Sequence, residues 1–216
     1  MLHVPEGRIW DLDRTLMLGV NGSWGAGWDG FWWLATQPLT WMPLFVATIW
    51  LLWRRLGWRW MLVALGVIVL GLALADQTAN FFKTYTPKFR PSRTLLPWGE
   101  AGVAYNSMIH TVKSLFTGEN YIGGNFGTVS GHAATAMAIG LTAAGIVQRR
   151  WFWFAMGVYV VLTSFSRLYL GVHFPLDILF GLTAGTFIGL GMIALWRRVE
   201  TRGRRRGQRD TFLDKT

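Results

Sequence analysis

Residues 166–177 read SRLYLGVHFPLD and form a short polar segment between two apolar stretches. Charged and titratable side chains are costly between hydrophobic spans and are therefore candidates for function. His173 and Asp177 are four residues apart, which places them one turn apart on the same face of a helix. Pro175 suits the first turn of that helix. Asp177 can then hold one imidazole nitrogen of His173 and leave the other free as a nucleophile. The alternative is that this polar pair only caps a membrane helix.

The composition of the 216-residue chain indicates a membrane protein. Hydrophobic residues make up 52% of it and charged residues only 15%, which is too apolar for an ordinary soluble domain. The chain has no cysteine, so disulfides and thiolate metal sites are excluded. Its net charge of +10 is compatible with nucleic-acid binding. However, the basic residues gather at the ends of apolar runs, which is typical of membrane topology. We therefore expect no nucleic-acid partner.

The apolar stretches predict an all-α fold, a polytopic transmembrane helix bundle of five or six spans. Pro38 and Pro43 interrupt the first stretch and predict a kink there. The third stretch is dominated by glycine and alanine. Small residues permit close helix packing, so we expect it to be the buried central helix. The five candidate spans cover residues 30–53, 60–82, 131–147, 151–165 and 176–196.

The segments outside these spans complete the expected organisation. Residues 9–21 are amphipathic and too short to span, which predicts an N-terminal interfacial helix. Residues 83–130 form a long extracytoplasmic loop in which residues 101–116 suggest a short surface helix. We expect a single membrane domain over residues 1–198. Residues 199–216 form a basic cytoplasmic tail, for which we expect disorder and contact with anionic lipid. Whether the N-terminal segment adds a sixth span stays open.

The basic clusters predict which ends of the spans share a side of the membrane. Residues 54–59, residues 149–150 and the C-terminal tail all carry arginines, and the positive-inside rule makes their side cytoplasmic. The loop 83–130 and the segment 166–177 then fall together on the opposite face. We therefore expect an integral protein of a bacterial inner (plasma) membrane, with its active site facing the periplasm or exterior.

Two further motifs on that face suit a phosphate group. Lys83 and Arg90 lie near the outer end of the second span, where arginine offers bidentate donors and lysine a point charge. Snorkelling at the interface is the alternative for such a lysine. Ser130-Gly131-His132 opens the third span, and a helix N-terminus favours an anion. His132 is a candidate acid there, although an ordinary serine N-cap also explains the pattern.

Together the three motifs resemble the signatures of the type-2 phosphatidic acid phosphatase superfamily. Their order, internal spacing and placement at span ends all agree with the family, and the resemblance covers roughly residues 60–196. Val129 departs from the pattern, because the family usually has proline at this position. The matching residues are Lys83-x6-Arg90-Pro91, Ser130-Gly131-His132 and Ser166-Arg167-x5-His173-x3-Asp177.

The resemblance implies a phosphatase that works through a phosphohistidine. His173 would attack phosphorus, Asp177 would fix its tautomer, and His132 would protonate the leaving oxygen. Phosphoryl transfer needs mainly positioning and charge stabilisation. No carboxylate cluster has metal-ligand spacing, so we expect a metal-independent reaction with no cofactor. The implied phosphate-binding residues are Lys83, Arg90, Ser130, Gly131 and Arg167.

The expected substrate is a lipid phosphate or diphosphate drawn from the surrounding membrane lipids. The small size of the chain and its short connections outside residues 83–130 favour undecaprenyl diphosphate, with phosphatidylglycerol phosphate, phosphatidate and lipid A phosphates as the nearest competitors. A lipid phosphotransferase would differ only in replacing water with a hydroxyl acceptor. A non-catalytic lipid-binding protein would be expected to lack one of His132, His173 and Asp177. Soluble vanadate-dependent haloperoxidases share the three-part pattern but not the apolar spans.

Overall fold

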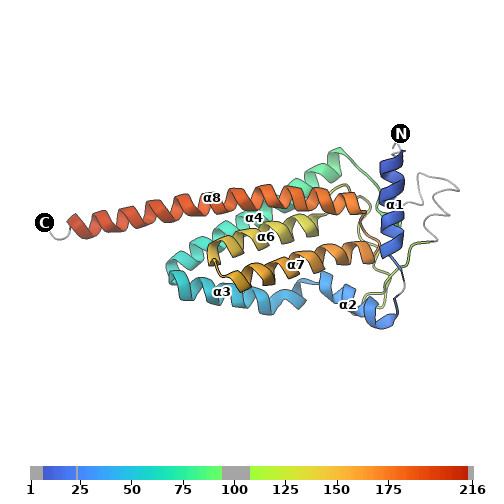
Figure 1. Ribbon diagram of the computed structural model, residues 1–216, viewed down its shortest axis with the longest axis horizontal. Helices are drawn as coiled ribbons and strands as arrows, with labels where there is room; N and C mark the ends of the chain where they lie inside the picture. Colours follow the sequence, from blue (N-terminus) through green and yellow to red (C-terminus); the bar gives the residue numbers. More distant parts are fainter. Residues whose placement is uncertain (1–6, 23, 94–107, 214–216) are drawn as a thin grey trace.

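The computed structural model describes residues 7–22, 24–93 and 108–213, and this part of the chain is all-α (Figure 1). Its extended pairing is limited to isolated β-bridges that join Phe89 to Phe126 and Lys113 to Asn120. The predicted all-α class is therefore confirmed. The helices in chain order are α1 (Arg8–Val20), α2 (Ala26–Thr36), η1 (Pro38–Trp41), α3 (Met42–Leu56), α4 (Trp58–Tyr85), η2 (Pro91–Arg93), α6 (Gly131–Val147), α7 (Arg150–Tyr169) and α8 (Pro175–Leu213).

Helix α6 is the central helix of the bundle, as its small residues predicted. It packs against α3, α4, α7 and α8, and most of its side chains are buried. Glycines bring α6 and α8 into close contact. A Cβ at Gly181 would lie 2.5 Å from the carbonyl oxygen of Ser130, and a Cβ at Gly145 would lie 2.6 Å from Ile193 Cδ1. The absence of a side chain at these positions therefore sets the distance between the two helices.

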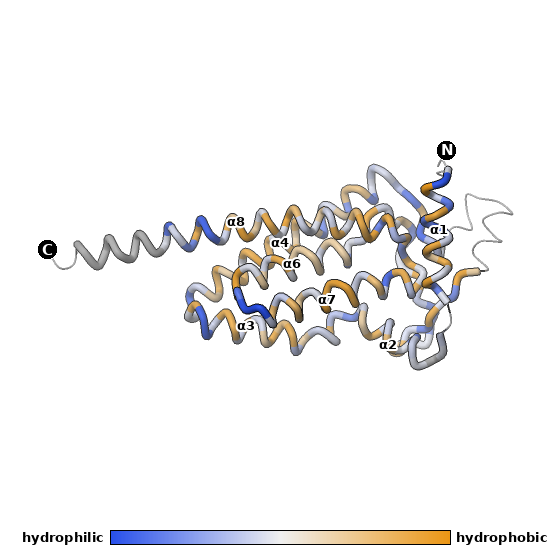
Figure 2. The backbone as a smooth tube through the Cα atoms, viewed as in Figure 1, coloured by the Kyte–Doolittle hydropathy of each residue, from blue (hydrophilic) through white to orange (hydrophobic). Residues whose placement is uncertain are grey.

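The predicted spans correspond to helices of the structure. Among the described residues, α4, α7 and α8 are long and apolar enough to cross a membrane, and the bent pair of α2 and α3 makes a fourth candidate. Helix α6 has 17 residues and is enclosed by its neighbours. Figure 2 shows apolar residues along the bundle and hydrophilic residues at its ends. The chain is thus an integral membrane protein, whereas its number of spans, five or six, stays a prediction.

The first span is broken where the two prolines predicted a kink. The axes on either side of the break differ by 76°. Pro38 lies in the first turn of η1 and Pro43 in the first turn of α3, where a missing N–H costs no helical hydrogen bond. Thr36, the last residue of α2, is buried at this break. The bend therefore brings a polar side chain into the interior of the bundle.

The two ends of the bundle divide the polar segments as the basic clusters predicted. The α3–α4 and α6–α7 turns lie at one end (Figure 1), where Arg55 donates hydrogen bonds to Val147 O and to Gln148 Oε1. Residues 86–93 after α4, the loop between α7 and α8, and helix α1 lie at the opposite end, here called the motif end. All three motifs share the motif end. Its periplasmic orientation and the interfacial position of α1 stay predictions.

Two local features differ from expectation. Residues 108–116, the described part of the expected surface helix, form no helix. Their backbone groups bond to a neighbouring segment instead: Val112 O accepts a hydrogen bond from Tyr121 N, and Ser114 N donates one to Glu119 O. The remainder, residues 101–107, lies outside the described residues. Helix α8 continues to Leu213 through the tail for which disorder was expected. Arginine has a high helix propensity, and extending an existing helix needs no new nucleus. The domain boundary at residue 198 stays a prediction.

Candidate active site

The motif end is organised by a contact between the first turns of α6 and α8. Ser130 is the N-cap of α6, and its side chain accepts a hydrogen bond from Ala133 N at 3.4 Å. Its backbone N–H donates to the carbonyl oxygen of Asp177 at 2.9 Å. This bond holds the Ser130-Gly131-His132 motif beside the His173 motif. The backbone N–H of Ser130 is therefore already used within the protein.

His173 lies in the loop between α7 and α8 and is only 1% exposed. Its Nδ1 is 3.1 Å from the carbonyl oxygen of Gly127 and 3.4 Å from Asp177 Oδ2. A carbonyl oxygen can only accept a hydrogen bond, so Nδ1 carries the proton and Nε2 keeps its lone pair. Burial lowers the pKa of His173 well below its usual range, and the positive charges of Arg90 and Arg167 lower it further. The imidazole is therefore neutral at neutral pH, as a nucleophile requires.

Asp177 lies one turn after His173, as the four-residue spacing predicted, and it does more than contact the imidazole. Its Oδ2 accepts a hydrogen bond from Phe174 N at 2.9 Å, and its Oδ1 accepts one from Lys88 Nζ at 2.9 Å. Lys88 also contacts Asp13 Oδ2 at 3.3 Å. The carboxylate is thus fixed by a backbone N–H and an ammonium group, and it shares Nδ1 of His173 with the Gly127 carbonyl.

Lys83 reaches the α6 N-terminus from the last turn of α4, and Arg90 lies in the segment that follows α4. Lys83 Nζ would lie 3.4 Å from a Cβ at Gly131, and it donates to Asn80 Oδ1 at 3.3 Å. Asn80 in turn donates to Asp76 Oδ2 at 2.9 Å, so the stripe of polar residues on α4 forms a chain of contacts that ends at Lys83. Arg90 is largely buried, and its Nε donates to Phe126 O at 3.0 Å.

Arg167 is buried near the end of α7 with 2% of its surface exposed. One guanidinium nitrogen, Nη1, donates to Thr36 Oγ1 at 2.6 Å and to the Tyr121 hydroxyl at 2.9 Å. The guanidinium also lies over the Tyr121 ring, 5.4 Å from its centroid. Its Nε is buried without a hydrogen-bond partner. A buried cation with an unused donor is costly unless a ligand anion completes it.

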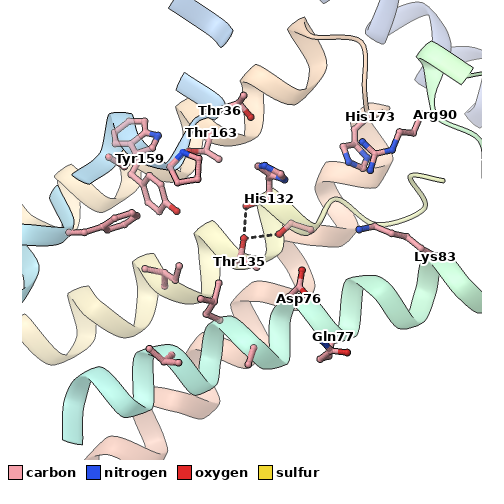
Figure 3. Close-up of a pocket in the computed structure, with 18 residues that line it drawn as sticks. Thr36, Asp76, Gln77, Lys83, Arg90, His132, Thr135, Tyr159, Thr163 and His173 are labelled. Carbon is pink, nitrogen blue, oxygen red and sulfur yellow. Dashed lines mark hydrogen bonds between the residues drawn. The ribbon is translucent and has the colours of Figure 1, made fainter. Parts of the chain in front are cut away.

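A cavity of about 710 Å³ joins most of these groups. It lies between α2–α3, α4, α6 and α7, and its lining includes Lys83, Arg90, Gly131, His132 and His173. Figure 3 shows Arg90 and both histidines around the same space, with Lys83 beside it. Of the residues that the sequence singled out, Ser130, Arg167 and Asp177 are buried and are not part of the lining.

The described residues offer no group of three or more histidine, aspartate or glutamate side chains arranged to hold a metal ion. The cavity instead concentrates cationic groups at one end, which suits the oxygen atoms of a phosphoryl group.

The sequence did not predict a role for five residues that contact the site, namely Gly127, Lys88, Asp13, Thr36 and Tyr121. For two of them a signal did exist, because Lys88 lies inside the Lys83–Pro91 motif and Gly127 is three residues before Ser130.

The PAP2 superfamily sequence model matches residues 62–201, and the chain therefore belongs to this superfamily. It is accordingly a membrane phosphohydrolase, as the three motifs predicted. A lipid A 4'-phosphatase of Porphyromonas gingivalis is 29% identical over 182 residues, which are 84% of this chain and 71% of the relative. The lipid A 4'-phosphatase of Bacteroides thetaiotaomicron is 28% identical over 180 residues, 83% of this chain and 74% of that protein.

The putative undecaprenyl-diphosphatase YbjG of Escherichia coli is 28% identical over 164 residues, 76% of this chain and 71% of that protein. Two crystal structures share the fold. Aquifex aeolicus LpxE has a TM-score of 0.61 at 19% identity, covering 85% of this chain and 95% of its own. A PAP2-type phosphatidylglycerolphosphate phosphatase of Bacillus subtilis has a TM-score of 0.60 at 18% identity, covering 88% of this chain and 87% of its own.

Proposed function

We propose that the protein hydrolyses the phosphate ester of a membrane lipid, with His173 as nucleophile and His132 as general acid. The observation that carries this proposal is the cavity that both histidines line together with Lys83 and Arg90. A phosphoryl group bound there meets two cations and a neutral imidazole nitrogen. Arg167, with its unused buried Nε, adds a third positive charge beside them. Ser130 and the N–H of Gly131 lie at the N-terminus of α6, where the helix dipole favours a bound phosphate.

The geometry supports a two-step displacement. Nε2 of His173 attacks phosphorus, the bond from phosphorus to the lipid oxygen breaks, and His132 transfers its proton to that oxygen. Binding of the phosphate anion favours the protonated form of His132 that this step needs. A water oxygen then attacks the phosphohistidine, the P–N bond breaks, and His132 takes up a proton from the water. Gly127 O and Asp177 stabilise the charge on the imidazole by holding Nδ1–H.

The shape of the cavity supports an amphiphilic substrate. On α4 its lining changes from Val69 through Asp76 to Lys83 toward the motif end, and on α6 it changes from Ile139 to His132. Both helices therefore present apolar side chains at mid-bundle and charged ones at the motif end. A phosphate headgroup fits the charged end, and an acyl or prenyl chain fits the apolar end and the surrounding lipid.

Among lipid phosphates we propose a phosphorylated sugar lipid of the lipid A type as the first candidate. Two relatives are named lipid A 4'-phosphatases and each aligns over more than four-fifths of this chain. The cavity also carries polar side chains beyond the phosphate-binding residues, such as Thr36, Asp76 and Thr135. Sugar hydroxyl groups can bond to such side chains, whereas a prenyl chain cannot. Undecaprenyl diphosphate is the second candidate, supported by the relative from E. coli.

The proposal includes an inner-membrane location with the motif end facing the periplasm. The chain has no cysteine, so a single Gly124→Cys variant reports on one side of the membrane. We expect a membrane-impermeant maleimide to label this variant in intact spheroplasts. Labelling only after the membrane is permeabilised would place the motif end in the cytoplasm.

The function itself is tested with the full chain purified in detergent. We expect phosphate release from lipid A bisphosphate to exceed release from undecaprenyl diphosphate, phosphatidylglycerol phosphate and phosphatidate, and to persist in EDTA. The His173→Ala variant should lose activity, and His110→Ala serves as a matched control, because His110 lies at the motif end and pairs with Asp29. Full activity in His173→Ala would refute the mechanism, and transfer of phosphate to a lipid or sugar hydroxyl would indicate a phosphotransferase.

A further inference from the structure

Lys88 lies between two buried carboxylates at the motif end. Its Nζ is 2.9 Å from Asp177 Oδ1 and 3.3 Å from Asp13 Oδ2. Asp177 and Asp13 are 1% and 3% exposed, respectively. The ammonium group also lies 4.7 Å from the ring centroid of Trp10 and 4.3 Å from that of Phe174. Lys88 is thus an enclosed cation with defined partners rather than a lysine that snorkels to the membrane surface.

Asp13 connects this cluster to helix α1. Its Oδ1 accepts a hydrogen bond from Leu176 N at 2.8 Å. The Asp13 carboxylate therefore packs against the first turn of α8, close to Asp177. Burial raises the pKa of Asp13, whereas the Leu176 N–H and the Lys88 charge act against this increase. Helix α1 therefore contributes the Asp13 carboxylate. Lys88 links this carboxylate to Asp177, which contacts His173.

We infer that Lys88 is a positioning residue of the phosphatase reaction, which keeps Asp177 ionised and directed at Nδ1 of His173, and that Asp13 holds Lys88 in place. This inference rests on the proposed function, because it assigns Lys88 a role through His173. It also gives α1 a part in the active site. The sequence of this helix predicts only an interfacial position.

The physical basis is the charge balance of two carboxylates in a water-poor site. Two buried carboxylates side by side do not both stay ionised without a counterion. Without the ammonium group one of them takes up a proton at a pH at which both are ionised in the native protein. A protonated Asp177 would be a poor acceptor for Nδ1–H and would no longer stabilise the imidazole during attack.

The sign of the effect follows from all the charged groups around the nucleophile. Removing the Lys88 charge favours protonation of the cluster and of His173, so the acid limb of activity should move to higher pH. Removing the Asp13 charge should move it to lower pH. The other groups stay the same in both variants. They are Lys83 from α4, Arg90 from the segment after α4, His132 from α6, Arg167 from α7 and Asp177 from α8.

The test compares Lys88→Met, Lys88→Arg and Asp13→Asn with the controls Lys113→Met and Asp11→Asn. The side chains of Lys113 and Asp11 are exposed. Their substitutions remove one positive and one negative charge, as Lys88→Met and Asp13→Asn do. We expect Lys88→Met to lower kcat at neutral pH by about tenfold or more, with KM within about twofold, and to raise the pH of the acid limb by about one unit. Lys88→Arg should restore most of kcat, because it keeps the charge.

Opposite shifts of the acid limb in Lys88→Met and Asp13→Asn support the role, because loss of α1 docking alone would lower activity equally at all pH values. Wild-type kcat and pH profile in Lys88→Met would overturn the inference, as would shifts in the same direction in both variants. If Lys88→Met does not fold, the profiles of Asp13→Asn and Lys88→Arg decide it. Absence of phosphate release in the wild-type protein would instead refute the proposed function.

Discussion

Replacing Gly127 with alanine adds one methyl group between Arg90 and His173, the proposed nucleophile. The new Cβ would lie 2.8 Å from Arg90 Cγ and 3.2 Å from His173 Nδ1. Carbon atoms in contact lie about 3.5–4.0 Å apart, so the arginine, the imidazole or the backbone must move by about 0.7 Å or more. The site should therefore be distorted at the hydrogen bond that fixes the His173 tautomer.

A displacement of about 1 Å at a reacting group costs on the order of 100-fold in rate. We therefore expect Gly127→Ala to lower kcat for phosphate release by about 30- to 100-fold. Overpacking of this kind destabilises a protein by about 1–3 kcal/mol, so the variant should still fold. Phosphate release from a lipid substrate measures the first effect, and the midpoint of thermal unfolding measures the second.

Gly124→Ala is the matched control, because a Cβ at Gly124 meets no atom within 4 Å. It changes the same kind of residue in the same connection. We expect it to keep wild-type kcat. If Gly127→Ala stays within about threefold of the wild type, or if Gly124→Ala loses as much activity, the assignment of the Gly127 carbonyl to His173 is wrong.

Other contacts of the site and of the α6–α8 packing can be tested by single substitutions and by pH. Tyr121→Phe removes one hydrogen bond to Arg167, and we expect about a threefold to tenfold loss of kcat/KM with little change in thermal stability. Gly181→Ala places a Cβ 2.5 Å from a backbone carbonyl of the α6 N-terminus. It should destabilise the protein by about 1–3 kcal/mol in denaturant titration, while Gly191→Ala, with no neighbour within 4 Å, should not. The pKa of His173 is lowered, so the acid limb of kcat/KM set by this group should lie below pH ~6.5. For the same reason the free energy of unfolding should be highest above pH ~6.5. It should fall as the pH is lowered from there to the folded-state pKa of His173, because the unfolded chain binds this proton more readily.

The sequence predicted the helices and the motif end well, because both depend on local signals. Apolar length located the spans, glycine and alanine identified α6, and Pro38 located the break in the first span. The motifs could be grouped on one face because the basic clusters fixed the direction of each span. Where the sequence failed, it failed on segments whose state depends on a neighbour. The tail after Trp196 continues as a helix because α8 precedes it.

The contacts within the site were less accessible to sequence reasoning. The spacing of His173 and Asp177 predicted their contact, but not that Gly127 O would share the same nitrogen. Lys88 and Asp13 are 75 residues apart, and Thr36 is 131 residues from Arg167. Such pairs meet only once α1 and the broken α2–α3 span are docked, and no periodic pattern in either segment specifies its partner.

In the proposed mechanism, His173 carries the phosphoryl group during the reaction. The direct measurement is rapid acid-free quenching of the purified protein during turnover of a lipid phosphate, followed by peptide mass spectrometry under alkaline conditions that preserve phosphohistidine. We expect a phosphate on the peptide that contains His173. This phosphate should be lost by hydrolysis within one turnover, and it should be absent from the His173→Ala variant. Phosphorylation of His132 instead, or full turnover with no phosphorylated histidine at any time point, would contradict this mechanism.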